Sequence, residues 1–157
     1  MKVQKKQIHV LFSFALFLTL LVRIGASTAQ ADELFEFERF RGVPNPPVTI
    51  REIPGGGAAW TIARGEARLD DGGTFKVEVE GLVLVNTGAN PVPQFFATLS
   101  CQNLDGTTNN INTQPVPATV TGDAKIEEVL ILPPACLGVM VFVRSATNNR
   151  WFAVSGF

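Results

Sequence analysis

The stretch TFKVEVE, residues 74–80, decides the fold class because its apolar and charged side chains alternate without interruption. Positions 75, 77 and 79 are apolar and fall on one face of an extended chain, whereas positions 76, 78 and 80 are charged and fall on the other. This pattern is typical of an antiparallel strand with one face in a core and the other in solvent.

The residues on either side of this strand predict a hairpin. Asp70-Asp71-Gly72-Gly73 precedes it and has the composition of a tight turn, in which glycine adopts positive φ. Glu66 to Leu69 then forms the preceding strand. After the strand, Gly81 is a candidate bulge, and the apolar run Leu82 to Val85 continues beyond it.

Further along the chain, short strands again alternate with turns. Residues 95–101 place Cys101 on the same face as three apolar side chains. Asp105-Gly106 predicts a hairpin turn that leads to a short edge strand near Ile111.

The last third of the chain predicts three more strands. Ala124 to Leu132 is a longer strand whose phase is broken by Glu128, so either Glu128 faces inward at an edge or a bulge shifts the register. Gly138 to Arg144 and Arg150 to Ser155 predict a final hairpin.

These elements predict an all-β fold, an antiparallel two-sheet sandwich of about eight short strands that is immunoglobulin-like in the broad sense. An antibody-type domain is a poorer match, because its tryptophan lies between the two cysteines, whereas Trp60 and Trp151 lie outside the pair here. The sandwich domain is expected over residues 49–157, after an N-terminal arm and linker over residues 32–48.

Residues 1–31 have the three parts of a secretory signal peptide. Lysines come first, an apolar run over residues 10–22 follows, and Ala29-Gln30-Ala31 supplies the small residues of a cleavage site. The alternative is an uncleaved anchor, but the apolar run is shorter than the ~20 residues that span a bilayer. We therefore predict a secreted, extracellular protein without stable membrane insertion after cleavage.

Cleavage before Asp32 leaves nine basic and fourteen acidic residues, a net charge of −5. This balance disfavours nucleic acid as a partner, because phosphate neutralisation dominates such binding. The only histidine, His9, is lost with the signal peptide, and the chain has no tyrosine. The lack of histidine excludes nucleophilic catalysis that depends on an imidazole, and it excludes histidine-based metal sites. We therefore predict no catalytic residue and no cofactor.

Cys101 and Cys136 are the only cysteines and both belong to the exported part. An oxidising compartment favours a disulfide between them, which stabilises the fold by roughly 4 kcal/mol in the chain-entropy model. Two free thiols or a metal site are the alternatives, but two thiols without histidine supply half a zinc shell at most.

The acidic residues allow two other hypotheses. Paired carboxylates are the requirement of a glycoside hydrolase that works without histidine. The carboxylates considered are those of Glu66, Asp70, Asp71, Glu78, Glu80, Glu127 and Glu128. Asp70 and Asp71 are also calcium candidates, although their spacing does not match an EF-hand. Turn and surface roles account for these residues without either activity.

Two groups of aromatic residues are candidate contacts. Leu34, Phe35, Phe37 and Phe40 form an arm that either docks a protein partner, as a strand or an amphipathic helix, or packs back onto the sandwich. Trp60 and Trp151 either stack on sugar rings of a glycan or belong to the core.

The chain resembles small secreted bacterial β-sandwich proteins of uncharacterised function. The residues that carry the resemblance are Trp60-x-Ile62-x-x-Gly65-x-Ala67-Arg68-Leu69, Val77 to Val83, Asn90-Pro91-Val92-Pro93, Cys101, Cys136, Phe142-Val143 and Arg150 to Phe157. The resemblance implies a bacterial source and brings no catalytic or binding residues. A looser similarity to chordin-type and copper-zinc dismutase-like sandwiches covers Gly65 to Leu82, but the metal-binding histidines of the dismutase are absent.

The sequence as a whole predicts a secreted non-enzymatic β-sandwich that binds an unknown protein or glycan partner, or has a structural role at the cell exterior. The two alternatives are a carbohydrate-binding module that uses exposed tryptophan, and a carboxylate-only glycoside hydrolase.

Overall fold

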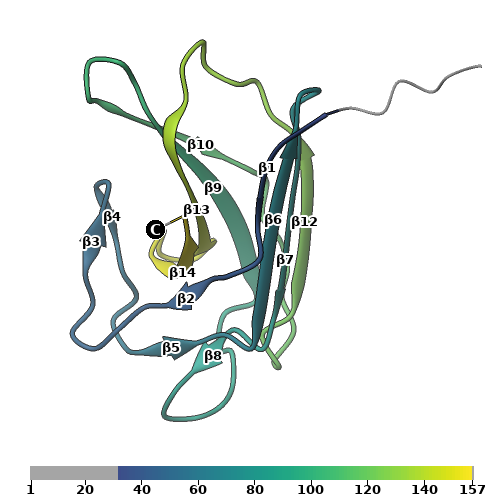
Figure 1. The fold of residues 1–157 in the computed structure, drawn as a ribbon. Helices are drawn as coiled ribbons and strands as arrows, with labels where there is room; N and C mark the ends of the chain where they lie inside the picture. The colour runs from purple at the N-terminus through teal and green to yellow at the C-terminus, as the bar shows by residue number, and fades with distance from the viewer. Residues whose placement is uncertain (1–31, 157) are drawn as a thin grey trace, which may run out of the picture.

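The computed structural model of the protein describes residues 32–156 and is all-β within this range, without helices (Figure 1). The predicted signal peptide lies outside the described residues. The fourteen strands form antiparallel sheets, which confirms the prediction of an all-β, antiparallel fold. They outnumber the eight predicted, and several of them are only two residues long. Over residues 32–156 no helix has the length and apolar character needed to cross a membrane.

The first sheet has four strands in the order β1-β6-β7-β12. They are β1 (Glu33–Phe37), β6 (Arg64–Asp70), β7 (Thr74–Glu80) and β12 (Ala124–Val129). β6 and β7 form the predicted hairpin, and the apolar side chains of β7 are buried while its charged ones are exposed. The turn is closed by Asp70, whose backbone carbonyl accepts the Gly73 N–H at 3.0 Å and whose carboxylate accepts the Thr74 N–H at 2.8 Å.

The second and larger sheet has the strand order β10-β9-β13-β14-β2, and β11 also pairs with β9. Its strands are β2 (Arg41–Gly42), β9 (Gln94–Gln102), β10 (Thr108–Asn112), β11 (Val116–Pro117), β13 (Leu137–Ser145) and β14 (Trp151–Ser155). The predicted turn at Asp105-Gly106 and the final hairpin are both confirmed, with Gly106 at a φ of +82°.

Two two-stranded sheets complete the fold: β3 (Thr49–Ile50) pairs with β4 (Ile53–Pro54), and β5 (Trp60–Thr61) pairs with β8 (Val83–Leu84). The apolar run after β7 therefore does not extend that strand. Gly81 has a φ of +65°, which turns the chain out of the four-stranded sheet so that β8 pairs with β5 instead.

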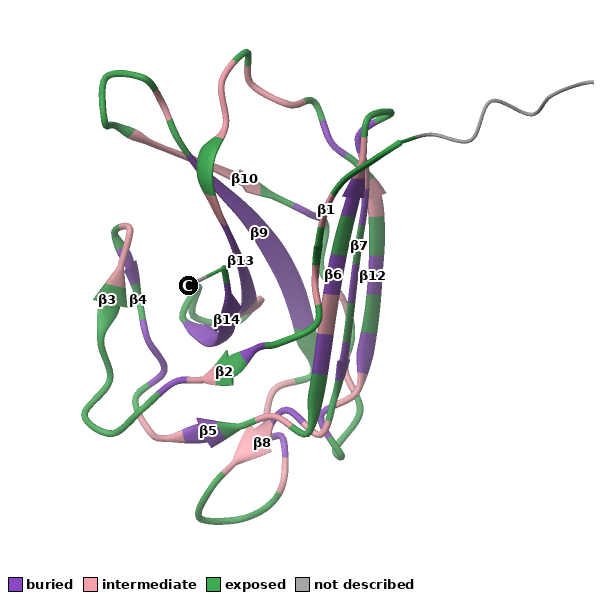
Figure 2. Ribbon diagram, in the orientation of Figure 1, coloured by how far each residue is buried: buried purple, intermediate pink, exposed green. Residues whose placement is uncertain are grey.

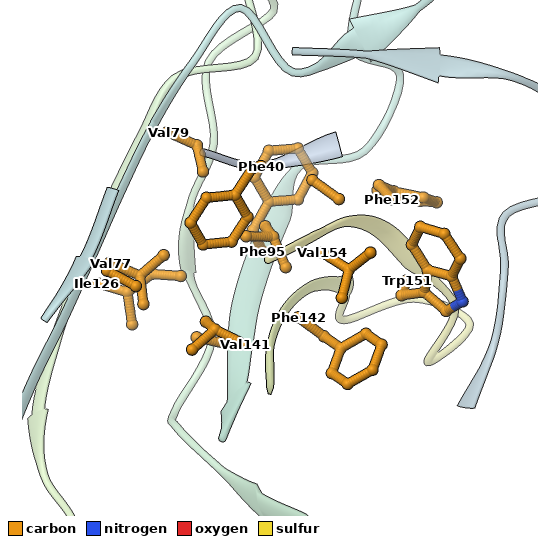
Figure 3. Close-up of a cluster of buried hydrophobic side chains, with 14 of the residues drawn as sticks. Phe40, Val77, Val79, Phe95, Ile126, Val141, Phe142, Trp151, Phe152 and Val154 are labelled. Atoms are coloured by element: carbon orange, nitrogen blue, oxygen red, sulfur yellow. The ribbon is translucent and has the colours of Figure 1, made fainter. Parts of the chain in front are cut away.

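The two larger sheets face each other across one apolar core (Figure 3). The four-stranded sheet contributes Phe75, Val77 and Ile126, and the larger sheet contributes Phe95 and Val141, all of them buried. On the other side of the larger sheet lies the β3–β4 hairpin, so this sheet is the middle of three layers (Figure 1).

This middle position explains why β9 is buried on both faces, as Figure 2 shows along most of its length. Phe95, Ala97, Leu99 and Cys101 face the core, as predicted. The residues between them are also buried, and these are Phe96, Thr98 and Ser100. An alternating pattern normally indicates one solvated face, and here that face is covered by other parts of the fold.

The alternatives at Glu128 are resolved by the register of β12. The pairing of β12 with β7 runs without a shift from Ala124 opposite Val79 to Val129 opposite Thr74, so there is no bulge. Glu128 therefore shares the inward parity of Ile126 and lies at the edge. Its carboxylate accepts the backbone N–H of Gln114 at 2.6 Å.

The cysteines form the predicted disulfide, which joins the end of β9 to the loop before β13. Cys101 is fully buried and Cys136 is half-buried, and no free cysteine occurs within residues 32–156.

Candidate binding site under the β3–β4 strap

Both tryptophans lie in the interior, which corrects the hypothesis of an exposed sugar-stacking platform. Trp60 is 6% exposed and stacks on Phe152 with ring centroids 3.8 Å apart. Trp151 is 1% exposed and packs edge-on against Phe142. A stacking platform needs a solvent-exposed ring face, and neither ring presents one.

The N-terminal arm is a strand and not a helix. β1 pairs with β6, and β2, which follows it, pairs with β14, so residues 32–48 contribute edge strands to both larger sheets. Phe40 is buried, and Phe35 and Phe37 pack partly buried against the core, whereas Leu34 is 55% exposed. The arm thus places its three phenylalanines against the fold.

Asp70 and Asp71 lie at the β6–β7 turn, where a calcium ion would need several further oxygen ligands. The contacts of Asp70 are those of a turn residue, and Asp71 is exposed beside it. Within residues 32–156 there is no group of three or more His, Cys, Asp or Glu side chains that is able to hold a metal ion.

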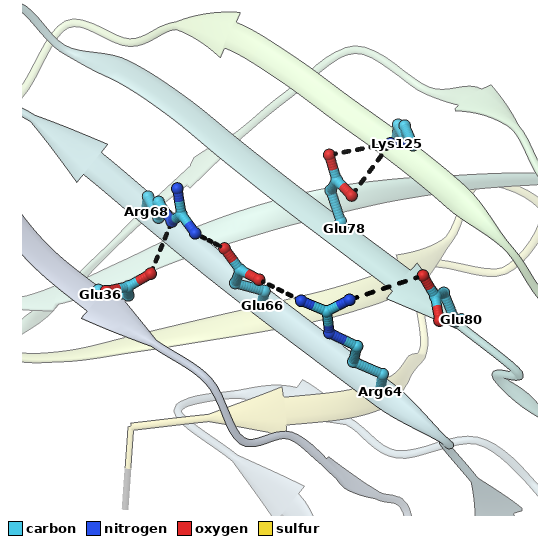
Figure 4. A network of polar contacts seen from close by, with 7 residues as sticks. All are labelled: Glu36, Arg64, Glu66, Arg68, Glu78, Glu80 and Lys125. Atoms are coloured by element: carbon cyan, nitrogen blue, oxygen red, sulfur yellow. Dashed lines mark hydrogen bonds and ion pairs between the residues drawn. The ribbon is translucent and has the colours of Figure 1, made fainter.

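Of the carboxylates considered for glycoside hydrolysis, those of Glu66, Glu78, Glu80 and Glu127 lie on the outer face of the four-stranded sheet and pair with cations. Figure 4 shows the first three of them. Glu66 contacts both Arg64, at 3.0 Å, and Arg68. Lys125 contacts Glu78 at 3.1 Å, and Lys76 contacts Glu127 at 2.9 Å. These ion pairs lie on a surface that is exposed to solvent, and each contributes about 0–1 kcal/mol to stability.

One feature that the sequence did not predict is the β3–β4 hairpin, which we call the strap (residues 48–55). It is closed by the two-residue turn Arg51-Glu52, because Ile50 pairs directly with Ile53. Both turn residues have positive φ, 46° and 65°, as a type I′ turn requires. Residues other than glycine, asparagine or aspartate are uncommon there, and such strain persists only where surrounding contacts fix the conformation.

Those contacts come from the larger sheet. At the tip of the strap, the Arg51 guanidinium donates to the Ser100 carbonyl at 2.7 Å, to the Ser100 hydroxyl at 3.2 Å, and to the Gly138 carbonyl. At its base, the Trp151 indole N–H donates to the Val48 carbonyl at 3.2 Å, and Arg150 donates to the Gly55 carbonyl at 2.8 Å. Both ends of the strap are therefore fixed to β9, β13 and β14.

A cavity of about 300 Å³ lies between the strap and the outer face of the larger sheet. It is lined by Arg41, Gly42, Pro44, Val48, Ile50, Trp151 and Val154, and we call it the strap pocket. Most of these side chains are apolar, and Arg41 supplies one cation. This combination, an apolar hollow with one polar group that orients a ligand, is characteristic of small-molecule sites, although the volume is at the lower limit for them.

Three other hollows have larger volumes and are weaker candidates. The smallest of them, of about 330 Å³, is bordered by Asn45, Gly57, Ala58, Ala59, Val85 and Asn86. A second, of about 530 Å³, is bordered by Glu78, Glu80, Asp123 and Lys125. Glu78 and Lys125 pair with each other, and Asp123 accepts hydrogen bonds from the Gly81 N–H and from two threonine hydroxyls. The third, of about 560 Å³, lies between the end of β1 and the end of β14 and is mostly bordered by backbone and exposed polar side chains.

Of the residues proposed from the sequence as ligand contacts, the structure brings one to the strap pocket. Trp151 lines it, while Trp60 lies on the inner side against Phe152. The sequence signals for the other lining residues were the prolines at 44, 46 and 47, which end the arm, and the short pattern Thr49-Ile50. Neither signal distinguishes a strap from an ordinary linker.

Comparisons with models of protein families, with curated proteins and with solved structures find no match.

Proposed function

We propose that the protein is a secreted, non-enzymatic binding protein of immunoglobulin-like sandwich architecture, and that the strap pocket holds its ligand. The strap pocket is the observation that carries this proposal. It is an apolar hollow with a cation in its lining, and its roof is held in a strained turn by specific contacts. The predicted signal peptide supports a role outside the cytoplasm, and so does the disulfide, because disulfides persist in oxidising compartments.

The lining defines the chemistry of the ligand. Pro44, Val48, Ile50 and Val154 favour an apolar group, and the guanidinium of Arg41 favours an anion at one end of it. A small monocarboxylate with an alkyl chain fits both requirements. We therefore propose this class of ligand for the strap pocket.

We propose binding in preference to glycoside hydrolysis because several of the candidate carboxylates are already engaged in ion pairs or hydrogen bonds within the fold. Glu66 and Glu78 are ion-paired, and Glu128 accepts the Gln114 N–H. A general acid in a glycosidase instead needs a carboxyl group poised against a second one across the substrate.

The experiment that tests the proposal measures binding of decanoate and of decanol to the purified exported protein. Tryptophan fluorescence reports binding directly, because Trp151 lines the pocket. We expect decanoate to bind and to raise the melting temperature, by several degrees at a concentration of about 100 Kd. Arg41→Gln is expected to weaken the binding of decanoate about tenfold and the binding of decanol less than twofold.

A pair of matched variants tests the location of the ligand. Val48→Phe fills the strap pocket and is expected to abolish binding of both probes. Val129→Phe makes the same change at a position that is 68% exposed on the opposite sheet and is expected to bind normally. Absence of decanoate binding by the wild-type protein, or equal binding by the two variants, would refute the proposal.

A further inference from the structure

The two outer faces of the molecule differ in how their positive charges are balanced. The four basic residues of the four-stranded sheet, which are Arg64, Arg68, Lys76 and Lys125, all contact carboxylates. Figure 4 shows these contacts for Arg64, Arg68 and Lys125. On the larger sheet, the guanidinium groups of Arg51, Arg144 and Arg150 have neutral oxygens as their hydrogen-bond acceptors within the described residues. The larger sheet therefore carries positive charge that is not neutralised, although the net charge of the exported chain is negative.

Arg144 is held on the outer face of β13. Its guanidinium donates to the Thr98 hydroxyl at 3.2 Å, to the Asn112 side-chain oxygen at 3.3 Å and to the Asn149 carbonyl. It also lies over the Phe96 ring, 4.9 Å from its centroid. These contacts fix the direction of the guanidinium without cancelling its charge.

Arg51 lies on the same face, further along β9. It is bound at Ser100, two residues from the Thr98 that contacts Arg144, a separation of about 7 Å along a strand. Burial lowers the pKa of Arg51 and of Arg144, which shows that the surroundings disfavour the isolated positive charges and that a nearby anion would stabilise them.

Neutral polar groups lie between these cations. Asn110 and Asn112 of β10 are paired with Ser100 and Thr98 of β9. The side-chain oxygen of Asn110 is buried and accepts no hydrogen bond within the described part of the chain. A buried acceptor without a donor costs free energy.

We propose that the outer face of the larger sheet, over β10, β9 and β13, binds an acidic polysaccharide. Its carboxylate or sulfate groups would lie against Arg51, Arg144 and Arg150. Nucleic acid is also anionic but has fewer hydroxyl groups, so the experiment includes it as a comparison. This inference does not depend on a ligand in the strap pocket, although Arg51 and Arg150 also anchor the strap.

The experiment measures affinity of the purified exported protein for heparin, polygalacturonate, neutral dextran and duplex DNA at 50 and 300 mM NaCl. Heparin and polygalacturonate distinguish sulfate from carboxylate as the recognised group. We expect one of them to bind at low salt, with affinity at least tenfold weaker at high salt, and we expect dextran not to bind. Failure of both acidic polymers to bind, or equal affinity for DNA, would overturn the proposal.

Charge-matched variants locate the site. Arg144→Gln/Arg150→Gln is expected to weaken binding at least tenfold, whereas Arg64→Gln/Arg68→Gln, which changes net charge equally on the opposite sheet, is expected to weaken it less than threefold. Equal losses would indicate nonspecific attraction and contradict the proposal. Arg150 is exposed, so Arg150→Gln alone, with an expected loss of about threefold, remains informative if the double variant does not fold. Unchanged decanoate binding by Arg144→Gln alone would separate this site from the strap pocket, because Arg150 also anchors the base of the strap.

Discussion

At the residue scale, Asp123 shows how one carboxylate organises a turn. It accepts hydrogen bonds from the hydroxyl groups of Thr121, at 2.7 Å, and Thr119, at 3.2 Å, and from the Gly81 N–H at 2.9 Å. The hydrogen bond from Thr121, followed by those from Gly81 and Thr119, lowers the pKa of Asp123 below its ordinary value. The carboxylate thereby ties the start of β12 to the end of β7.

This lowered pKa predicts a pH dependence of stability. A carboxyl group whose pKa is lower in the folded state stabilises the fold above its unfolded pKa of about 3.9, and the contribution disappears as pH falls through the folded pKa. We expect Asp123→Asn to melt at a lower temperature than wild type at pH 6, and the difference to shrink below pH 4. Melting curves between pH 2 and 7 measure this. Asp71→Asn, an exposed turn residue, is the control, and a difference for Asp123→Asn that does not vary with pH would contradict the prediction.

At this scale the sequence predicted which side chains point into the core and which point outward, wherever the alternation of neighbouring residues determines this. Phe75, Val77 and Val79 are buried as the alternation indicated. It did not predict that Thr98 and Ser100 are buried too. Their burial depends on the Arg51 and Arg144 side chains, which reach them from 49 and 46 residues away in the chain.

At the scale of elements, the strap depends on Arg51 because its two-residue turn contains no glycine. We expect Arg51→Met, which keeps most of the aliphatic stem but removes the donors, to lower the free energy of unfolding by about 2 kcal/mol. Amide exchange should accelerate at Gly55 and Gly56, whose N–H groups donate to Val48 and Trp151.

Arg64→Met is the matched control for the strap variant. Its ion pairs are exposed, so a change of about 0–1 kcal/mol is expected, with no effect on exchange at Gly55 or Gly56. Wild-type protection of these two amides in Arg51→Met, measured by hydrogen exchange, would show that the strap does not depend on the arginine.

Elements closed by local turn chemistry were predictable, and the two-residue strands were not. The β6–β7 and β13–β14 hairpins follow from adjacent alternating segments joined by short turns. β5 and β8 instead meet because Gly81 redirects the chain, and they pair Trp60 with Leu84. Such short pairings have no periodicity of their own and follow from the packing of the rest of the fold.

At the scale of the whole molecule, the disulfide joins residues 35 positions apart. The chain-entropy model gives about 4 kcal/mol for closing a loop of this length. We expect Cys101→Ala/Cys136→Ala to lose about that amount in urea denaturation under non-reducing conditions. Reduced wild-type protein should show a similar loss, and an unchanged unfolding midpoint in both samples would contradict the prediction.

The order of the strands within each sheet could not be predicted from the sequence, for a related reason. Individual strands are specified locally, but the position of β2 beside β14 joins Arg41 to Val154 across most of the chain. The strap pocket is assembled from the same distant segments, which is why Trp151 was a candidate contact from the sequence and its pocket partners were not.

The position of the strap also determines when the strap pocket forms. The strap is among the first described segments to be synthesised, yet its anchors lie 49 to 103 residues later, at Ser100, Gly138, Arg150 and Trp151. Contacts of such separation form only after the intervening chain has been ordered. During synthesis the strap therefore remains undocked until β14 has been made, so the strap pocket is complete only in chains that include β14.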